Sequence, residues 1–392
     1  MLSMFPTPST VKNSAFKTSL VYQNPTQRVI QNGCFSQLAG VLESLHPNKI
    51  LLVLGEKSFR SSPYFNRLMN MLTPYQIIQS VPVAQNPTQQ FVEGELNQLR
   101  SETTGVDLVL AIGGGSVIDV AKIFAAFLKN DIHLDTFLKG NAELHEEPIP
   151  LIAVPTTSGT GSEVTPYASL ETLEQKKVTL DHYYFYPRLA LIDPELTYTL
   201  PNYVTASTGF DALSQAIESF WSIHATPFSR THALRALDMI VGSLDKAVHE
   251  HENASARFDM SFASCEAGLA IAQTKTTAVH SVSYPITAHF RIVHGHACAL
   301  TLSSFIRFNA PVLKEEGRPL LSAFKVSSYE DMANQVDRLM ERVGLQRKLS
   351  SLAIQREGLE LIVRDGFRPD RIKNNPREVT KKALQDILNQ IY

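Results

Sequence analysis

Cysteine is scarce in this sequence, and its few copies argue against a disulfide-stapled fold. Only three of the 392 residues are cysteine: Cys34, Cys265 and Cys298. Because their number is odd and they lie far apart, we expect reduced thiols in a cytoplasmic protein. Residues 1–16 have neither a charged start nor a long apolar segment, so we expect no signal peptide.

An excess of one charge and long hydrophobic runs are also missing. The chain has 36 basic and 38 acidic residues, a net charge of −2, which offers no electrostatic attraction for nucleic acid. The longest apolar stretches have the length of a strand, too short for a membrane span. At 44% hydrophobic and 19% charged residues, the composition is that of a globular protein with room for two domains.

The two halves of the chain differ in pattern. In the first half, short apolar runs at 49–55, 107–115, 150–157 and 188–194 read as buried strands, and helical patterns such as 117–129 separate them. After Pro201 the strand signal fades, and 231–250 and 377–392 have apolar residues at helical spacing. We therefore predict an α/β domain with a doubly wound parallel sheet over 1–197 and an all-helical domain over 198–392.

A run of three glycines follows the second of these strands. Gly113, Gly114 and Gly115 let the backbone approach a ligand closely, and the helix that follows aims free N–H groups at an anion. A dinucleotide pyrophosphate fits such a loop, although a tight turn with nothing bound would look similar. The G-x-G-x-x-G fingerprint itself is absent.

A second small-residue loop follows the third strand, at 153–166. It contains six hydroxyl residues, which suit contacts to ribose, phosphate and a nicotinamide amide. The alternative is a flexible surface loop, and we consider it weaker than a binding loop because the segment follows a buried strand directly. The hydroxyls that we expect at a cofactor are Thr156, Thr157, Thr160 and Ser162.

Metal-ligating side chains gather in the second half. Asp211 and Gln215 lie four residues apart and thus on one face of a helix. His280 and His294 lie fourteen apart, on different elements or opposite helix ends. Together the four make a four-ligand metal site plausible. The alternatives are a polar helix edge and ordinary packed histidines.

The motifs "GGGSVIDVAK", "PTTSGTGSEVT", "LIDPELTYTLP", "TGFDALSQAIE" and "VHGHACAL" resemble those of the iron-containing (group III) alcohol dehydrogenases. They follow the family's order over about residues 20–390. The resemblance implies the dehydroquinate synthase-like fold, with a dinucleotide-binding α/β domain, a helical domain and the active site between them. It also implies binding of NAD or NADP and of a divalent metal, with Fe²⁺ expected first and Zn²⁺ or Ni²⁺ as alternatives.

Carried over to this sequence, the family's metal ligands fall on Asp211, His280 and His294. The family's remaining histidine ligand falls on Gln215, whose neutral amide oxygen is a weaker donor than imidazole. The resemblance therefore implies either a weaker metal site or loss of the metal. Tyr284 stands where many members have a further histidine, and it either donates a proton or only walls the pocket.

The stretches "FDALSQAIESFWS" and "TKTTAVHSVSYPITAHFRIVHGHA" are similar to the phosphonoacetaldehyde reductase-like branch of the family. That branch implies a small anionic aldehyde as the substrate. Lys275 and Arg291 flank the two histidines, and either could meet a phosphonate or carboxylate. Both could equally face solvent.

The cofactor specificity stays open on the sequence. Glu56 could bind a ribose 2′-hydroxyl, whereas Lys57, Ser58 and Arg60 could bind a 2′-phosphate. The resemblance places Ser116 and Asp119 at the cofactor. It also places Lys177, or Lys176 beside it, near the ribose.

We therefore predict hydride transfer between a nicotinamide and an aldehyde or primary alcohol, in a homodimer that binds neither nucleic acid nor membrane. Two rival functions remain: a lyase of the dehydroquinate synthase type, and a metal-free nucleotide-binding pseudoenzyme. The glutamine at position 215 motivates the second rival.

Overall fold

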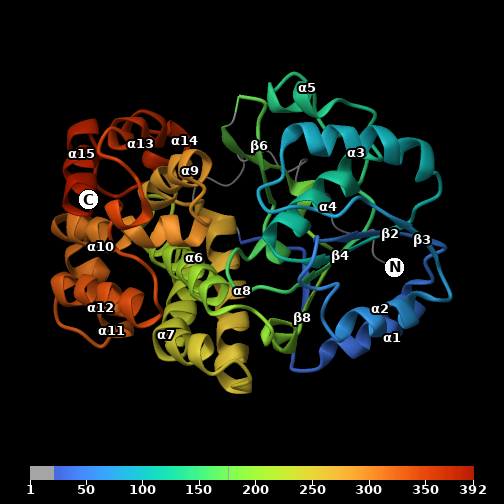
Figure 1. Cartoon of the computed structure of the whole chain (residues 1–392), viewed down its shortest axis with the longest axis horizontal. Coiled ribbons are helices and arrows are strands. Elements are labelled where there is room, and N and C mark those ends of the chain that lie inside the picture. The colour runs from blue at the N-terminus through green and yellow to red at the C-terminus, as the bar shows by residue number, and fades with distance from the viewer. Residues whose placement is uncertain (1–21, 175) are drawn as a thin grey trace.

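A computed structural model describes residues 22–174 and 176–392. The expectation about a signal peptide concerns residues outside this range. The described chain has an α/β part, coloured blue to green in Figure 1, and a helical part, coloured yellow-green to red. The predicted fold class is confirmed. The exact domain boundary at residue 197 stays a prediction, and the long helix α6 begins at Asn202.

The α/β part is built on a six-stranded sheet in which all paired strands are parallel. The strand order is β1-β8-β5-β4-β2-β3. The four predicted strands are confirmed as β2, β4, β5 and β8, whereas β1 and β3 were not expected because they are short and partly exposed. The strands are β1 (Gln27–Ile30), β2 (Lys49–Leu54), β3 (Gln76–Gln79), β4 (Leu108–Gly113), β5 (Leu151–Pro155) and β8 (Leu189–Ile192).

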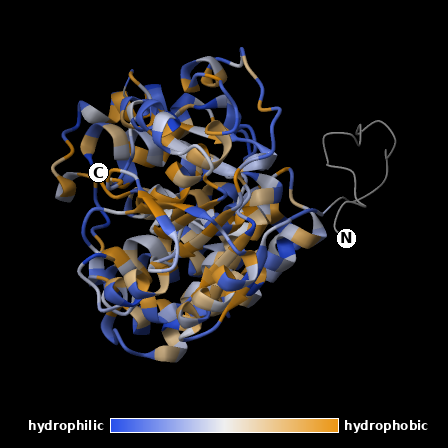
Figure 2. Ribbon diagram, turned by 90° about the vertical axis from the view of Figure 1, so that its right-hand side faces the viewer, coloured by the Kyte–Doolittle hydropathy of each residue, from blue (hydrophilic) through white to orange (hydrophobic). Residues whose placement is uncertain are grey.

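Helices cover both faces of this sheet, which explains why its central strands are apolar at every position. In β4, Val109 and Ala111 pack on one side, with residues of α3 (Gln89–Glu102) and α4 (Gly115–Phe127). Leu108 and Leu110 pack on the other side, with residues of α1 (Leu38–Leu45) and α2 (Tyr64–Leu72). Figure 2 shows the hydrophobic strands enclosed by ribbons of mixed character.

A two-stranded antiparallel hairpin stands apart from the main sheet and was not foreseen. It pairs β6 (Tyr167–Glu171) with β7 (Lys177–Asp181). Buried and half-exposed residues alternate in β6, and β7 has a single buried residue, so neither strand produces the continuous apolar run that revealed the others. Together with the short helix α5 (Leu134–Leu138), it belongs to the N-terminal part.

The second part is all helical, as predicted. Its core is one cluster of buried apolar side chains drawn from α6 to α15. No helix in the described ranges is long and apolar enough to cross a membrane. The helices are α6 (Asn202–Trp221), α7 (Pro227–His249), α8 (Ala254–Thr274), α9 (Ala278–Phe290), α10 (His294–Leu313), α11 (Arg318–Ala323), α12 (Tyr329–Arg342), α13 (Gly358–Gly366), α14 (Pro369–Ile372) and α15 (Lys381–Gln390).

Candidate active site

A cavity of about 540 Å³ lies between the two parts and brings most of the predicted site residues together. Its α/β wall comes from the loops at the carboxyl ends of β2, β4 and β5, the usual ligand side of a parallel sheet. Its helical wall comes from α6, α9 and the start of α10. The volume is typical of a site for a small molecule or cofactor.

The glycine loop ends β4 and starts α4, as the sequence predicted. Two of its glycines are required by packing within the protein. A Cβ on Gly113 would lie 2.5 Å from Val117, and one on Gly115 would lie 2.7 Å from Thr160. A Cβ on Gly114 would come no closer than 3.3 Å to Thr157. Packing within the protein therefore does not account for Gly114, and we expect a ligand in the cavity to need the space at this position.

The predicted hydroxyl residues Ser116, Thr156, Thr157 and Thr160 line the cavity beside this loop. These hydroxyls and the N–H groups at the start of α4 together form a polar cradle for an anionic cofactor. The cradle fits a dinucleotide.

Asp119 and Ser162 also line the cavity, and a network holds them in place. The Ser162 hydroxyl and the Ser169 amide donate to the Asp119 carboxylate. Beneath them Lys122, fully buried, donates to the Ser162 hydroxyl at 2.8 Å and to the Tyr167 carbonyl at 2.6 Å. Burial lowers the pKa of Lys122 to about 8, although Asp119 opposes the shift. Lys122 thus ties α4 to the second loop, a role that the sequence analysis missed.

Three of the four residues considered for the adenosine ribose lie at the cavity. Glu56, Lys57 and Ser58 line it. Arg60 does not, and its Nε donates to the Gly55 carbonyl at 3.3 Å. The arginine is therefore engaged with its own loop.

The predicted metal ligands meet at the other end of the cavity. The Nε2 atom of His280 lies 3.3 Å from Oδ1 of Asp211, and the Nε2 atom of His294 lies 3.8 Å from the same oxygen. Asp211 and His280 are buried, at 3% and 4% exposure. Without a cation between them, these atoms would be a poorly arranged set of hydrogen bonds, whereas they fit a divalent metal well.

Gly295 allows this meeting. A Cβ on Gly295 would lie 1.8 Å from the carbonyl oxygen of Ser207, so any other residue would push α10 away from α6. The contact holds His294, the first residue of α10, against Asp211. The glycine in "VHGHACAL" therefore sets the geometry of the metal end.

Gln215 has the bonding pattern expected of a ligand. Its Nε2 donates to the Thr160 carbonyl at 3.3 Å, which fixes the side chain. Its Oε1 is buried and has no hydrogen-bond donor in the described part of the chain. An orphaned buried acceptor is costly unless something occupies it, and a cation beside Asp211 would do so. The residues at this end thus fit the metal that the resemblance implies.

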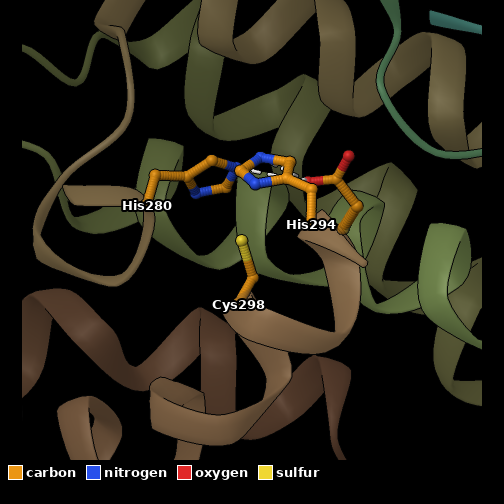
Figure 3. Close-up of side chains that lie close together, drawn as sticks. His280, His294 and Cys298 are labelled. Carbon is orange, nitrogen blue, oxygen red and sulfur yellow. Dashed lines mark hydrogen bonds and ion pairs between the residues drawn. The ribbon is translucent and has the colours of Figure 1, made fainter. Parts of the chain in front are cut away.

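Cys298 is a further donor that the sequence analysis treated only as a scattered thiol. One ligand atom each of Asp211, His280, His294 and Cys298 lie within 4.8 Å of one another. Figure 3 shows the Cys298 sulfur pointing toward the two imidazole rings. It comes from α10, one helical turn after His294, a spacing that could have signalled it.

The electrostatics favour the metal-binding forms of Asp211 and His294, whereas Cys298 and Glu218 raise the pKa of His280 against the effect of burial. Burial raises the pKa of Asp211, but His294 and His280 outweigh it and hold that pKa below its usual value. Burial lowers the pKa of His294 well below its usual value, and the positive charge of Lys177 adds to the shift. The carboxylate is therefore ionised and the His294 imidazole neutral, as metal coordination requires.

Glu218 orients His280 and was also missed. This fully buried carboxylate pairs with Nδ1 of His280 and accepts from the backbone N–H and the hydroxyl of Thr277, at 2.9 and 2.7 Å. Nε2 of His280 is thereby left for the site. Asp211, Gln215 and Glu218 lie at i, i+4 and i+7 on α6, so one polar helix face holds both the ligands and their support.

We expect Glu218→Gln to weaken metal binding about tenfold, because outer-sphere partners of a ligating histidine typically contribute 10- to 100-fold. The measurement is a chelator competition on metal-loaded protein, with the melting temperature recorded alongside. Glu252→Gln, at an exposed position beside α8, is the control. Unchanged metal affinity in a folded Glu218→Gln protein would show that Glu218 has only a structural role.

Tyr284 lines the cavity beside the metal end. Its ring centroid lies 5.7 Å from that of His294, and its hydroxyl shares a 3.2 Å hydrogen bond with the hydroxyl of Thr179. Lys177 also lines the cavity, and its Nζ lies 5.4 Å from the centre of the Tyr284 ring. Both residues therefore lie at the cavity, and the contact of Lys177 with the cofactor ribose stays a prediction.

The structure does not bring Lys275 and Arg291 to the cavity. The Nζ of Lys275 pairs with Asp181 at 2.8 Å, and its side chain is half exposed. Arg291 pairs with Glu171 at 3.1 Å, and its side chain is 65% exposed. Besides Lys177, a cation that lines the cavity is Arg371, which lies 87 residues after Tyr284 and had no sequence signal.

Comparison with known proteins decides the family. The family described as "Iron-containing alcohol dehydrogenase" matches residues 25–194, and its C-terminal counterpart matches residues 205–392. The chain belongs to the iron-containing alcohol dehydrogenases. It is thus an oxidoreductase, and the lyase rival is excluded.

Relatives within this family differ in substrate. Long-chain-alcohol dehydrogenase 1 of Geobacillus thermodenitrificans (strain NG80-2) is 34% identical over 68% of this chain and 70% of its own length. Phosphonoacetaldehyde reductase of Streptomyces viridochromogenes is 35% identical over 65% of both proteins. The crystal structure of sulfoacetaldehyde reductase from Bifidobacterium kashiwanohense in complex with NAD+ has a TM-score of 0.89 and 32% identity, covering 95% of this chain and 98% of that chain.

Proposed function

We propose that this iron-containing alcohol dehydrogenase is an NAD-dependent, metal-dependent reductase of a small anionic aldehyde such as phosphonoacetaldehyde. The observation that supports it most is the continuity of one cavity. Gly114 lines one end and the pair Asp211 and His280 lines the other. A dinucleotide and a small aldehyde bound in this cavity would meet beside the metal ligands.

Different residues of the chain would bind the metal and the dinucleotide. Asp211, Gln215, His280 and His294 hold the metal, and the glycine loop and its hydroxyls hold the dinucleotide. When bound, the metal supplies a Lewis acid for the carbonyl group and the nicotinamide supplies the hydride. The cleft aligns the two reactants. Tyr284 offers its hydroxyl to an oxygen in the cavity, with Thr179 fixing the phenol.

Two observations favour an anionic aldehyde. The relatives compared above include reductases named for phosphonoacetaldehyde and sulfoacetaldehyde, although a long-chain-alcohol dehydrogenase is equally similar in sequence. In this chain Lys177 and Arg371 place positive charge at the substrate end of the cavity. An anionic substrate would neutralise that charge.

We propose NAD as the cofactor rather than NADP. Glu56 lines the cavity, and an acid there suits a ribose 2′-hydroxyl. Arg60, the most suitable group for a 2′-phosphate, bonds to Gly55 instead. The related sulfoacetaldehyde reductase was crystallised with NAD+. The homodimer and the cytoplasmic location stay predictions.

Metal removal tests this function. We expect chelated protein to lose reduction of small aldehydes by NADH, and Fe²⁺ or Zn²⁺ to restore it, while NADH binding persists. NADPH should serve less well. Full activity in rigorously metal-free protein would overturn the mechanism. A protein that binds NADH but neither metal nor aldehyde would support the pseudoenzyme instead.

A further inference from the structure

Arg371 is a buried cation, and one donor atom of its guanidinium has no hydrogen-bond acceptor in the described part of the chain. The residue is 6% exposed, and the donor atom is Nε. The nearest carboxylate oxygen, Oδ2 of Asp370, is 3.8 Å from Nε of Arg371. The Asp370 side chain is half exposed, and its other oxygen pairs with Nε of Arg368 at 3.3 Å. Burying a charged group without a close partner is costly, and Arg371 lines the cavity.

Thr287 carries a second buried polar atom, its hydroxyl oxygen, without a hydrogen-bond partner in the described chain. The residue also lines the cavity. It follows Tyr284 by three residues on α9 and thus shares that helix face. Lys177 adds an ammonium 5.4 Å from the centre of the Tyr284 ring, and no ion pair of its Nζ is found among the described residues.

The backbone segments that carry Arg371 and Lys177 are fixed by bonds that do not use their charged atoms. Arg368, near the start of α14, donates from Nη1 to the Lys177 carbonyl and from its backbone N–H to the Ser281 hydroxyl, at 3.2 Å for the second. Asn374, just after α14, donates to the Thr276 carbonyl at 2.9 Å. The segment that carries Arg371 is thereby tied to β7 and α9, while the guanidinium stays available.

We propose that Arg371, Thr287 and Lys177 form the subsite for the terminal oxyanion of the substrate, and that it favours a three-oxygen phosphonate or sulfonate over a carboxylate. A planar guanidinium, a hydroxyl and an ammonium offer donors from three directions, whereas a carboxylate has only two oxygens to receive them. The subsite rests on the proposed function for its substrate, but its binding chemistry does not depend on turnover.

The subsite is separate from the cofactor's phosphates. The pyrophosphate cradle at the glycine loop belongs to the α/β part, whereas Arg371 and Thr287 belong to the helical part beside Tyr284, which in turn neighbours the metal ligand His294. An anion at Arg371 would therefore lie near the reacting aldehyde and not near the adenosine end.

The test is binding of ethylphosphonate, an unreactive anion, to the metal-loaded protein with NADH bound. By calorimetry we expect Arg371→Met to weaken binding between about tenfold and about a hundredfold, the loss typical of a hydrogen bond to a charged group. Thr287→Val, nearly the same shape, should weaken it about threefold, the loss of a neutral donor. Arg291→Met, at the exposed arginine paired with Glu171, is the control and should not change it.

The outcomes separate the subsite from the enzyme's function. If Arg371→Met and Thr287→Val bind ethylphosphonate as the wild type does, the subsite is wrong, even if aldehydes are reduced. If binding depends on Arg371 but no aldehyde is reduced, the subsite stands and the proposed function fails. Equal binding of propionate would overturn the preference for three oxygens. Equal weakening of NADH binding by Arg371→Met would assign the arginine to the cofactor.

Discussion

Gly114→Val is expected to raise the dissociation constant for NADH by about a hundredfold or more, which corresponds to about 2.8 kcal/mol. The loop backbone must approach the pyrophosphate closely, and a branched side chain at its centre fills that space. The fold should survive. The backbone of Gly114 is extended, with φ −77° and ψ −175°, a conformation open to valine, and the nearest atom to its Cβ, on Thr157, is 3.3 Å away.

The measurement is a fluorescence titration of NADH, together with the melting temperature. Gly94→Val is the matched control, because Gly94 lies on α3 with nothing within 4 Å of its Cβ. Gly113 would be the wrong choice, since a Cβ there meets Val117 at 2.5 Å and would disturb the strand itself. A folded Gly114→Val protein that binds NADH normally would refute the assignment of the loop.

Gln215 is the second site where a large effect is expected. Gln215→Ala should lower metal affinity by more than the 10- to 100-fold that the loss of an outer-sphere partner costs, because a direct ligand is removed. Gln215→His should raise it, since imidazole is the better donor for iron, zinc or nickel. Turnover need not rise with it, because a stronger donor reduces the Lewis acidity of the site.

Metal content per subunit and a chelator competition measure both changes. Gln98→Ala and Gln98→His, on the exposed face of α3, are matched controls. The structure motivates the prediction through the buried Oε1 of Gln215, which has no donor in the described part of the chain. Unaltered metal retention by Gln215→Ala would show that the glutamine does not ligate.

The spectrum of the cobalt-substituted protein then identifies the remaining donor. Cys298 lies within reach of the same point as Asp211, His280 and His294, and a thiolate ligand gives a charge-transfer band that an amide oxygen does not. The band should be absent from the wild type if Gln215 is the fourth ligand. Its presence, and its loss in Cys298→Ser, would assign that place to the cysteine.

Local patterns in the sequence determined much of the α/β part, including the glycine-rich turn at one end of the cavity. Buried parallel strands must be apolar on two faces, so β2, β4, β5 and β8 were visible as continuous runs. The hairpin β6–β7 was not, because half-buried strands leave only a weak alternation. The spacing of Asp211 and Gln215 likewise followed from helix geometry alone.

Which distant side chains join these groups was decided only by the tertiary structure. Lys275 and Arg291 are near the histidines in sequence, yet each pairs with a carboxylate of the hairpin, Asp181 or Glu171. Arg371 reaches the cavity because α14 packs against α9. Sequence proximity says little about which face of a helix or loop a long side chain takes, whereas packing between remote elements fixes it.

The sequence alone thus determined the class of fold and the glycine-rich turn between β4 and α4, because period and backbone conformation are local properties, whereas the metal ligands came from the family resemblance and stay a prediction. The tertiary structure decided that Glu218 supports His280, that Cys298 joins the metal end, and that Arg371 adds a buried cation at the substrate end. The roles of Glu218 and Arg371 depend on contacts between residues at least 62 positions apart, which no local pattern encodes. Cys298 follows His294 by one helical turn, but its place at the metal end depends on the close approach of α10 to α6 at Gly295.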